Sequence, residues 1–419
     1  MKITDIVLLS AALSCAAPAY AEYAMDKDVM DIGLIYCGGV HRPDWTQEEL
    51  KPYVVHEYAD GHKDWFFGSY LFLEYTSGNG IGFGTNYGTN AKKSDWEWLL
   101  DRIFAKDKGL DALDKCIEQY KAEIGEPSFR HNIVLGLAVP IDGQSDWGEL
   151  DGKKMNFNVR SHRLEAEKWY IDQMLSRFEE AGYKNLDLVG FYWIDEDGAS
   201  LGDFTVSVSD YIHEKGYKFY WIPFFATTYN KWEDYGFDLA FLQPNYFFNP
   251  NLHPSRVKDA CLAAKRNDLA LEMEWQHEVL FEYDGDEHGC RIDMLETYID
   301  TFEEQGVYDS SAIAYYSGTK AILQAYQSEH IEDTIILDRI AQYIVDRRNT
   351  LGGVEAVDDG SSLYVAGGRG SLYVRSDSGN ARIYTIDGRM IAEGNGLIDC
   401  PKGIYIVTAG GVSKKVMVK

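Results

Sequence analysis

Short runs of apolar residues recur along the chain, each bounded by Gly, Pro, Asn or Asp and separated from the next by a longer amphipathic segment. The clearest run, Leu186–Ile194, is rich in Leu, Val, Phe, Tyr, Trp and Ile. Strands that are buried on both faces belong to parallel sheets covered by helices. We predict seven further strands of this kind, at 31–37, 65–74, 131–140, 217–225, 237–243, 269–275 and 311–316.

The segments between these strands carry apolar residues at helical spacing. Residues 94–124 predict two helices that divide near Gly109, and a third helix is expected to start at Ser161 as its N-cap and to stop at Gly182. Further helices are predicted at 203–215, 254–265, 290–305 and 319–349. Eight strands that alternate with helices predict an α/β fold, a (β/α)8 TIM barrel. A doubly wound open sheet is the alternative, but no Gly-rich phosphate-binding sequence follows the first strand.

The pattern changes after Gly352. Alternating segments at 371–375, 381–386 and 403–407 are separated by Gly-rich turns, which predicts a small all-β sandwich. Residues 353–419 hold eight Lys and Arg against seven Asp and Glu, whereas the preceding part holds 32 against 60. We therefore predict a domain boundary near residue 350, with the barrel at 30–350 and the sandwich at 353–419.

The N-terminus has the pattern of a secretory signal peptide over residues 1–21. Lys2 precedes the apolar run Ile6–Ala17, and Ala19–Ala21 gives the small-x-small cleavage pattern. We therefore expect a secreted or cell-surface protein; lipidation at Cys15 is the less favoured alternative. No other segment approaches transmembrane length, so no membrane insertion is expected after the signal is removed.

Composition limits the classes of partner. A net charge of -27 repels nucleic acid and anionic membranes, so neither is expected as a partner. The aromatic content of 14% is common in proteins that handle sugars. Five cysteines remain after signal removal, without zinc or disulfide spacing, and are read as small buried hydrophobes. A solvated turn is favoured over a metal loop at Asp284–His288, and no cofactor is expected.

Carboxylates gather at the predicted carboxyl ends of the strands, where the ligands of a barrel bind. Asp195 or Asp197 can alternatively cap the next helix. Glu272 and Glu274 share strand parity, so both point into the barrel if one does, and Glu272 is expected to be a buried acid paired with Lys or Arg. The six candidates are Glu74, Asp195, Glu196, Asp197, Glu272 and Glu274.

Two carboxylates that face each other across a barrel mouth are the minimum apparatus of most glycosidases. We predict Glu196 as acid/base, with its pKa raised by Trp193 and Tyr192, and Glu274 as the nucleophile. Asp195 is expected to orient Glu196 or to replace it. Separations of about 5–5.5 Å allow retention of configuration, and about 6.5–9.5 Å allow inversion. A non-catalytic glycan-binding protein is the alternative, and a structural adhesin comes third.

Aromatic faces stack on sugars and amide side chains bond their hydroxyls, so the residues around the carboxylates are predicted to bind a carbohydrate substrate. A strand-eight tyrosine, Tyr315 or Tyr316, is expected to hold Glu274. The Gly/Asn-rich loop 76–89 is expected to be functional because of its length. The predicted substrate-binding residues are Tyr192, Trp193, Gln243, Asn245, Tyr246, Trp275, Tyr315, Tyr316, Glu74 and His41.

Three segments, Gly190–Glu196, Gln243–Tyr246 and Leu271–Glu274, resemble the bacterial family labelled DUF4855. The resemblance covers about residues 30–350 and implies a barrel of the glycoside-hydrolase type. The chain is also similar to retaining glycosidases with the acid/base on strand four and the nucleophile on strand seven. That similarity implies these roles for Glu196 and Glu274, although Asp195 stands where those enzymes have Asn.

The tail is similar to the C-terminal sorting domains of secreted Bacteroidetes proteins. The likeness lies in Ile383–Arg389, Lys402–Val407 and the basic end Lys414–Lys419. It implies export through a secretion machinery or attachment to the cell surface. A plain carbohydrate-binding or spacer module is the alternative.

Overall fold

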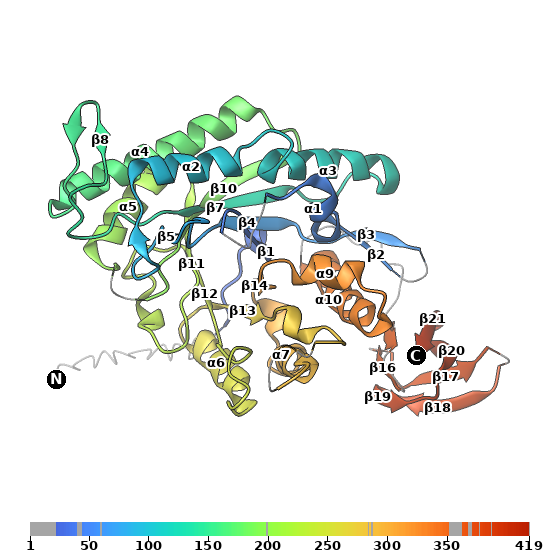
Figure 1. Ribbon diagram of the computed structural model, residues 1–419. Coiled ribbons are helices and arrows are strands. Elements are labelled where there is room, and N and C mark those ends of the chain that lie inside the picture. Colours follow the sequence, from blue (N-terminus) through green and yellow to red (C-terminus); the bar gives the residue numbers. More distant parts are fainter. Residues whose placement is uncertain are drawn as a thin grey trace, which may run out of the picture.

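The computed structural model describes residues 22–418, apart from 40–43, 59–60, 198–199, 284, 286–287, 352–362, 368–370, 377 and 387. Within these ranges, eight parallel strands close into a barrel, in the order β1-β14-β13-β12-β11-β10-β7-β4 (Figure 1). The predicted (β/α)8 barrel is confirmed. The strands are β1 (Asp31–Tyr36), β4 (Ser69–Leu73), β7 (His131–Leu137), β10 (Leu186–Trp193), β11 (Lys218–Trp221), β12 (Leu239–Leu242), β13 (Ala270–Glu274) and β14 (Ile313–Tyr316).

The helices form the outer layer, with α2, α3 and α4 lying together on one side of the sheet (Figure 1). Among the helices of the described ranges, none combines the length and apolar character needed to cross a membrane. The helices are α1 (Gln47–Val54), α2 (Lys93–Ile103), α3 (Gly109–Ile124), α4 (Arg160–Ala181), α5 (Asp203–Glu214), α6 (Ser255–Arg266), α7 (Ile292–Glu304), α8 (Val307–Ser310), α9 (Ala321–Gln327) and α10 (Ile331–Leu351).

Most helix boundaries follow the sequence signals. The helix predicted at 319–349 is instead two helices, α9 and α10, and the four-residue α8 was not predicted. The break at Gly109 is as predicted, and α4 ends at Gly182, which adopts the left-handed conformation with φ 60°. Ser161, however, is not the N-cap. The carbonyl of Val159 already accepts a hydrogen bond from the amide of Arg163, so Val159 is the N-cap and α4 begins at Arg160. The prediction also missed α1, whose capping box of Thr46 and Glu49 is visible in the sequence.

The register around β10 decides which side chains enter the barrel. Its pairing with β7 shifts between Leu188 and Gly190. A Cβ at Gly190 would lie 2.5 Å from the carbonyl oxygen of Lys218, so only glycine fits there. Beyond this bulge Tyr192 points into the barrel near the acidic residues, whereas Trp193 packs outward against Phe204 of α5.

Short two-stranded sheets and 3-10 turns lie in the segments that connect the strands and helices of the barrel. The pairs are β2 (Val55–Glu57) with β3 (Lys63–Trp65), β5 (Ile81–Gly82) with β6 (Thr89–Asn90), and β8 (Glu149–Leu150) with β9 (Lys153–Lys154). The 3-10 turns are η1 (Lys27–Val29), η2 (Tyr229–Lys231) and η3 (His277–Val279). The β5–β6 pair lies within the Gly/Asn-rich loop and gives that loop a fixed shape.

The C-terminal part is an all-β sandwich, as predicted. Two antiparallel sheets, β15-β16-β19 and β18-β17-β20-β21, share a core that includes Leu372, Val374, Ile383 and Val407. This core is separate from that of the barrel. The strands are β15 (Leu363–Gly367), β16 (Ser371–Ser376), β17 (Ala381–Thr385), β18 (Met390–Gly394), β19 (Gly396–Asp399), β20 (Gly403–Ala409) and β21 (Val412–Val418).

Candidate active site

Three glutamates meet inside the barrel at the carboxyl ends of its strands. Glu272 and Glu274 both lie on β13, and Glu196 follows β10 by three residues. Glu196 contributes to raising the pKa of both strand-seven glutamates, which places the three carboxyls in one electrostatic cluster. In barrel order β10 is the fourth strand and β13 the seventh. The fold thus brings together the two glutamates of the predicted pair.

Donors surround Glu274. Its Oε2 accepts a hydrogen bond from the hydroxyl of Tyr298 on α7, and its Oε1 lies 3.4 Å from Nδ2 of Asn245. Complete burial raises the pKa of Glu274 to about 8, and these bonds oppose the rise together with the backbone amides of Asn245 and Tyr246. Asn245 has φ 51°, a left-handed conformation that Asn tolerates better than most residues.

Glu272 lies deeper in the barrel, where its surroundings favour the protonated form. Burial raises its pKa well above the usual range, and Glu274 and Glu196 raise it further. The prediction that Glu272 pairs with Lys or Arg is wrong for the described residues, where no cation lies within salt-bridge distance of it. The polar groups near it are instead Tyr36 and Tyr192, which cannot neutralise a charge.

The carboxyl of Glu196 is held by a tyrosine from the loop that follows β4. Its Oε1 accepts a 2.6 Å hydrogen bond from the hydroxyl of Tyr75, the second residue after β4. Burial raises the pKa of Glu196, while hydrogen bonds from Tyr75 and Gln243 lower it. The expected influence of Trp193 on this pKa is not found, because the Trp193 indole points outward and donates to Oγ of Ser200.

The carboxylate of Asp195 holds the Gly/Asn-rich loop in place through hydrogen bonds. Its carboxylate accepts from the backbone amide of Thr85 at 2.8 Å and from the Thr85 hydroxyl at 2.5 Å. The Asp195 carbonyl accepts from Nε1 of Trp221 at 2.9 Å. A Cβ at Gly84 would come within 2.5 Å of Asp195 Oδ1, so the loop needs glycine at that point. Asp195 therefore links the residue before Glu196 to the loop wall.

Glu74, which directly follows β4, plays a similar part. Its Oε2 accepts from the amide of Gly39 at 2.7 Å, and its Oε1 accepts from the amide of Tyr75 at 2.9 Å. Glu74 is buried, so these bonds tie the loop after β1 to the loop after β4. Its carboxylate serves the backbone, and the adjacent Tyr75 is the side chain that reaches Glu196.

Several predicted substrate-binding residues lie at the mouth. Gln243 accepts from Nδ2 of Asn245 at 3.1 Å, so the two amides support each other beside the carboxyls. The Tyr246 ring packs on Tyr298 at a centroid distance of 6.0 Å. Tyr316 is half-exposed and meets the Tyr36 ring edge-on at 5.8 Å.

Two predicted residues are directed away from the site. The Tyr315 hydroxyl donates to Oδ1 of Asp31, an acid that is also paired with Arg347 of α10. Strand alternation explains this, because Tyr315 faces the helices when Tyr316 faces the barrel. The expected tyrosine partner of Glu274 therefore comes from α7 rather than from strand eight. Trp275 is completely buried on the side of the sheet opposite to Glu274. His41 lies outside the described residues, as do residues 1–21 and all three acidic positions of the segment 284–288.

The prediction missed four tyrosines that line the site. Tyr75 stacks on Tyr87 of the Gly/Asn-rich loop, with centroids 4.6 Å apart and planes inclined by 22°. Tyr36 lies 5.9 Å from Tyr75. The length of the Gly/Asn-rich loop indicated a functional loop, which contains Tyr87. Tyr298 has the helical spacing of a core residue, so the sequence did not indicate its contact with the site.

The described residues contain no group of three or more His, Cys, Asp or Glu side chains arranged to hold a metal ion. Among the five described cysteines none is in a disulfide, and all are buried except Cys290, which is half-buried.

The family model "Domain of unknown function (DUF4855)" matches residues 31–342, which is most of the barrel. The chain belongs to this family. A search of curated proteins found no match.

Solved structures of other barrels superpose on the chain at low similarity. A putative α-L-fucosidase from Bacteroides thetaiotaomicron gives a TM-score of 0.42 at 12% identity, covering 82% of this chain and 99% of the other. A family 18 chitinase from Crocus vernus gives 0.40 at 11% identity, with 75% and 99% covered. A GH113 β-1,4-mannanase gives 0.40 at 10% identity, with 77% and 99% covered. At these values the matches carry no argument about activity, which rests on the site itself.

Proposed function

We propose that this member of the DUF4855 family is a glycoside hydrolase in which Glu196 and Glu274 carry the reaction. The observation that carries the proposal is their convergence, from strands four and seven, within a mouth lined by tyrosines. A structural acid needs one charged partner. These acids are instead met by neutral donors, Tyr75 at Glu196 and Tyr298 at Glu274, and buried carboxyls with raised pKa values are typical of catalytic groups.

The donors indicate how the roles divide. Glu274 receives hydrogen bonds from Tyr298, from Asn245 and from backbone amides, and donors of this kind favour the ionised form. Glu274 is therefore the nucleophile. We assign Glu196 as the acid/base by its place after strand four. Burial raises the pKa of both glutamates, so the pair shares one proton, which Glu196 holds in the reactive form. The active protein carries one proton on this pair, while Glu272 keeps a proton of its own.

The reaction proceeds in two displacements. An oxygen of Glu274 attacks the anomeric carbon, and Glu196 gives its proton to the glycosidic oxygen as that carbon–oxygen bond breaks. Glu196, now ionised, takes a proton from water, which attacks the glycosyl–Glu274 ester. The products are two sugars with retained configuration, and both glutamates return to their starting forms.

The aromatic rim suits a neutral sugar chain. Tyr36, Tyr75 and Tyr316 form a connected set of rings, and the exposed Phe248 meets Tyr316 edge-on at 5.6 Å. Such rings stack on the C–H faces of sugars, while the amides of Gln243 and Asn245 bond hydroxyls. A polysaccharide or oligosaccharide is therefore the proposed substrate, with no cofactor.

The proposal includes the location of the protein. The pattern of residues 1–21 supports export through a signal peptide, and the resemblance of the tail supports sorting or surface attachment after export. A protein that hydrolyses polysaccharides acts where those polymers are found, outside the cell.

The test is a screen of the wild type and the variants Glu196→Gln and Glu274→Gln against a panel of plant, algal, fungal and bacterial polysaccharides. We expect each variant to lower kcat by about a thousandfold or more while glycan affinity stays within a few-fold. Glu126→Gln, at a side chain that is 75% exposed on the helical exterior, is the matched control. Glycan binding without cleavage by the wild type would replace the proposal with the non-catalytic binding function.

Proton NMR of the first product anomer tests the stereochemical part separately. A product of inverted configuration would reject Glu274 as the nucleophile and leave hydrolysis in place.

A further inference from the structure

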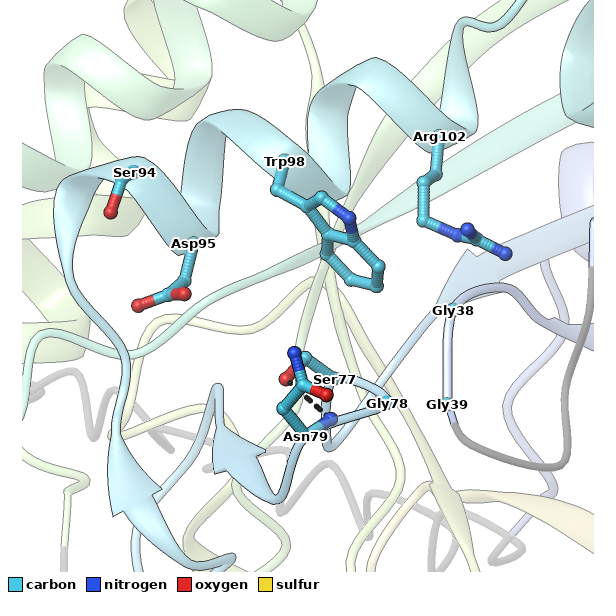
Figure 2. A pocket seen from close by; sticks show the side chains of 9 residues that line it. All are labelled: Gly38, Gly39, Ser77, Gly78, Asn79, Ser94, Asp95, Trp98 and Arg102. Carbon is cyan, nitrogen blue, oxygen red and sulfur yellow. Dashed lines mark hydrogen bonds between the residues drawn. The ribbon is translucent and has the colours of Figure 1, made fainter.

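A cavity lies between α2 and the loops that follow β1 and β4, and none of the three glutamates lines it (Figure 2). Its volume is about 580 Å³, and it is open to solvent. The Trp98 ring of α2 projects into it and faces the turn of Ser77 and Asn79, as Figure 2 shows. The backbone of Gly38 and Gly39 closes a further side. This volume is in the range of small-molecule sites in proteins.

The Trp98 indole is fixed in place although it is only half-buried. It lies parallel to the Phe83 ring, with planes inclined by 9° and centroids 6.5 Å apart. The Arg102 guanidinium lies 5.0 Å from the Trp98 ring centroid. A Cβ at Gly38, which has φ 144°, would approach the indole to 3.3 Å, so glycine lets the loop lie against the ring. A rigid, accessible aromatic face is the usual platform for a sugar ring.

The polar groups around the ring suit a neutral ligand rather than an anion. The only cation among the residues that line the cavity, Arg102, is paired with Asp44 at 2.5 Å. Asp95 adds a carboxylate, and Ser77, Ser94 and Asn79 offer hydroxyl and amide groups. A phosphate or an acidic sugar would meet the negative charge of Asp95, which accepts from the amide of Lys92, and a cation already neutralised by Asp44. An uncharged polyhydroxyl ligand can use every one of these groups.

The cavity is joined to the candidate active site through the same two loops. Gly39 donates to Glu74, and the next residue, Tyr75, donates to Glu196. Tyr75 and Ser77 lie two positions apart in the chain, so their Cα atoms are at most about 7 Å apart. The loop after β4 thus carries both a side chain that contacts Glu196 and a residue that lines the cavity.

We infer that this cavity is a sugar-binding subsite remote from the scissile bond, with Trp98 as its platform. The inference rests on the proposed function and names its substrate more closely: an uncharged glycan long enough to occupy Trp98 while one of its bonds lies between Glu196 and Glu274. A disaccharide at the glutamates does not reach the subsite, and a longer chain does.

The experiment compares Trp98→Ala and Asn79→Ala with the wild type on manno-, xylo-, cello- and chito-oligosaccharides, as disaccharides and hexasaccharides. We expect Trp98→Ala to lower kcat/KM for the hexasaccharide by about fivefold or more and to leave the disaccharide unchanged. Asn79 is exposed, so Asn79→Ala should not affect folding. This variant should also lower kcat/KM for the hexasaccharide and not for the disaccharide, but by a smaller factor than Trp98→Ala. Trp169→Ala, at a half-buried indole of α4 outside the cavity, is the matched control.

Binding is measured in parallel by calorimetry, with each substitution placed in the Glu196→Gln background. Equal losses for short and long ligands, or no loss for either, would overturn the subsite while hydrolysis and the proposed function survive. A wild type that neither binds nor cleaves any glycan of the series or the polysaccharide panel would overturn both. Circular dichroism of each variant separates a binding loss from a folding defect.

Discussion

The hydroxyl of Tyr298, on α7, donates a hydrogen bond to Oε2 of Glu274, the last residue of β13. A helix outside the barrel thus supplies the strongest contact to a carboxylate inside it. Tyr298 is fully buried, and its own pKa is raised by burial and by Glu274, so it stays a donor throughout the working pH range. The contact favours the ionised form of Glu274 and fixes its orientation.

Substituting Tyr298→Phe should therefore lower kcat more than it changes substrate affinity. A hydrogen bond to a charged group contributes about 1.5–3 kcal/mol, so the expected loss is about ten- to a hundredfold. The pKa of Glu274 should rise, because the bond that lowered it is gone. Steady-state kinetics across pH measures both effects. Tyr211→Phe removes the Tyr211–Asp172 contact on the helical exterior and should leave kcat unchanged.

The pH–rate profile should be bell-shaped and lie at higher pH than ordinary carboxyl groups would give. At low pH both Glu196 and Glu274 are protonated and the nucleophile is lost; at high pH neither is, and the acid is lost. Burial raises the pKa of both glutamates, and that of Glu274 to about 8, so the pair should keep its last proton up to about that pH, where the alkaline limb is expected. The acid limb should lie above the usual value of 4.5, because the pair is buried when it loses its first proton.

Glu272→Gln probes the third acid, whose protonated form is favoured by burial and by the nearby Glu274 and Glu196. A neutral amide then replaces a neutral acid, and we expect kcat to change by no more than about threefold. The same substitution at Glu196 or Glu274 should abolish turnover. A collapse of activity in Glu272→Gln with an intact fold would show that Glu272 exchanges its proton during the reaction and would reject the assignment of a static neutral acid.

Acid should destabilise the barrel through His131. Burial, together with the nearby charges of Arg348 and Lys121, lowers the pKa of His131 to about 3. Below its ordinary value of 6.5 the unfolded chain takes up a proton that the folded chain refuses, so stability falls as pH falls. The loss is about 1.4 kcal/mol per pH unit, or roughly 2 kcal/mol at pH 5.

Urea unfolding at pH 7 and pH 5 measures this term. His131→Phe should keep the aromatic packing against Trp65 and Phe129 and should lose less stability between the two pH values than the wild type. The exposed His62 serves as the control through His62→Gln. Identical pH slopes for wild type and His131→Phe would mean that His131 takes up its proton in the folded state.

The barrel and the sandwich are predicted to be independent domains with a boundary near residue 350. Their separate cores and the change in charge support this. Limited proteolysis should leave a stable core of about 36–38 kDa, at roughly 110 Da per residue for a compact domain. Resistance of the whole chain to cleavage would contradict the boundary.

Much of the fold could be predicted from the sequence because the signals that set it are local. Apolar runs such as Leu186–Ile194 fix a buried strand wherever they occur, and Gly109 and Gly182 end or divide helices through their own backbone freedom. The order of strands and helices then leaves few topologies. Barrel closure follows, and with it the meeting of strand-four and strand-seven carboxylates.

The partners of those carboxylates were decided only by the tertiary structure. Whether Tyr192 or Trp193 enters the barrel depends on the register shift at Gly190, which arises from the backbone of the neighbouring strand β11. The donor to Glu274 is Tyr298 rather than Tyr315. Side-chain alternation along β14 points Tyr315 toward Asp31, whereas the packing of α7 on the barrel places Tyr298 beside Glu274. Spacing along the chain specifies elements, whereas contacts between distant side chains follow from how the closed barrel aligns those elements.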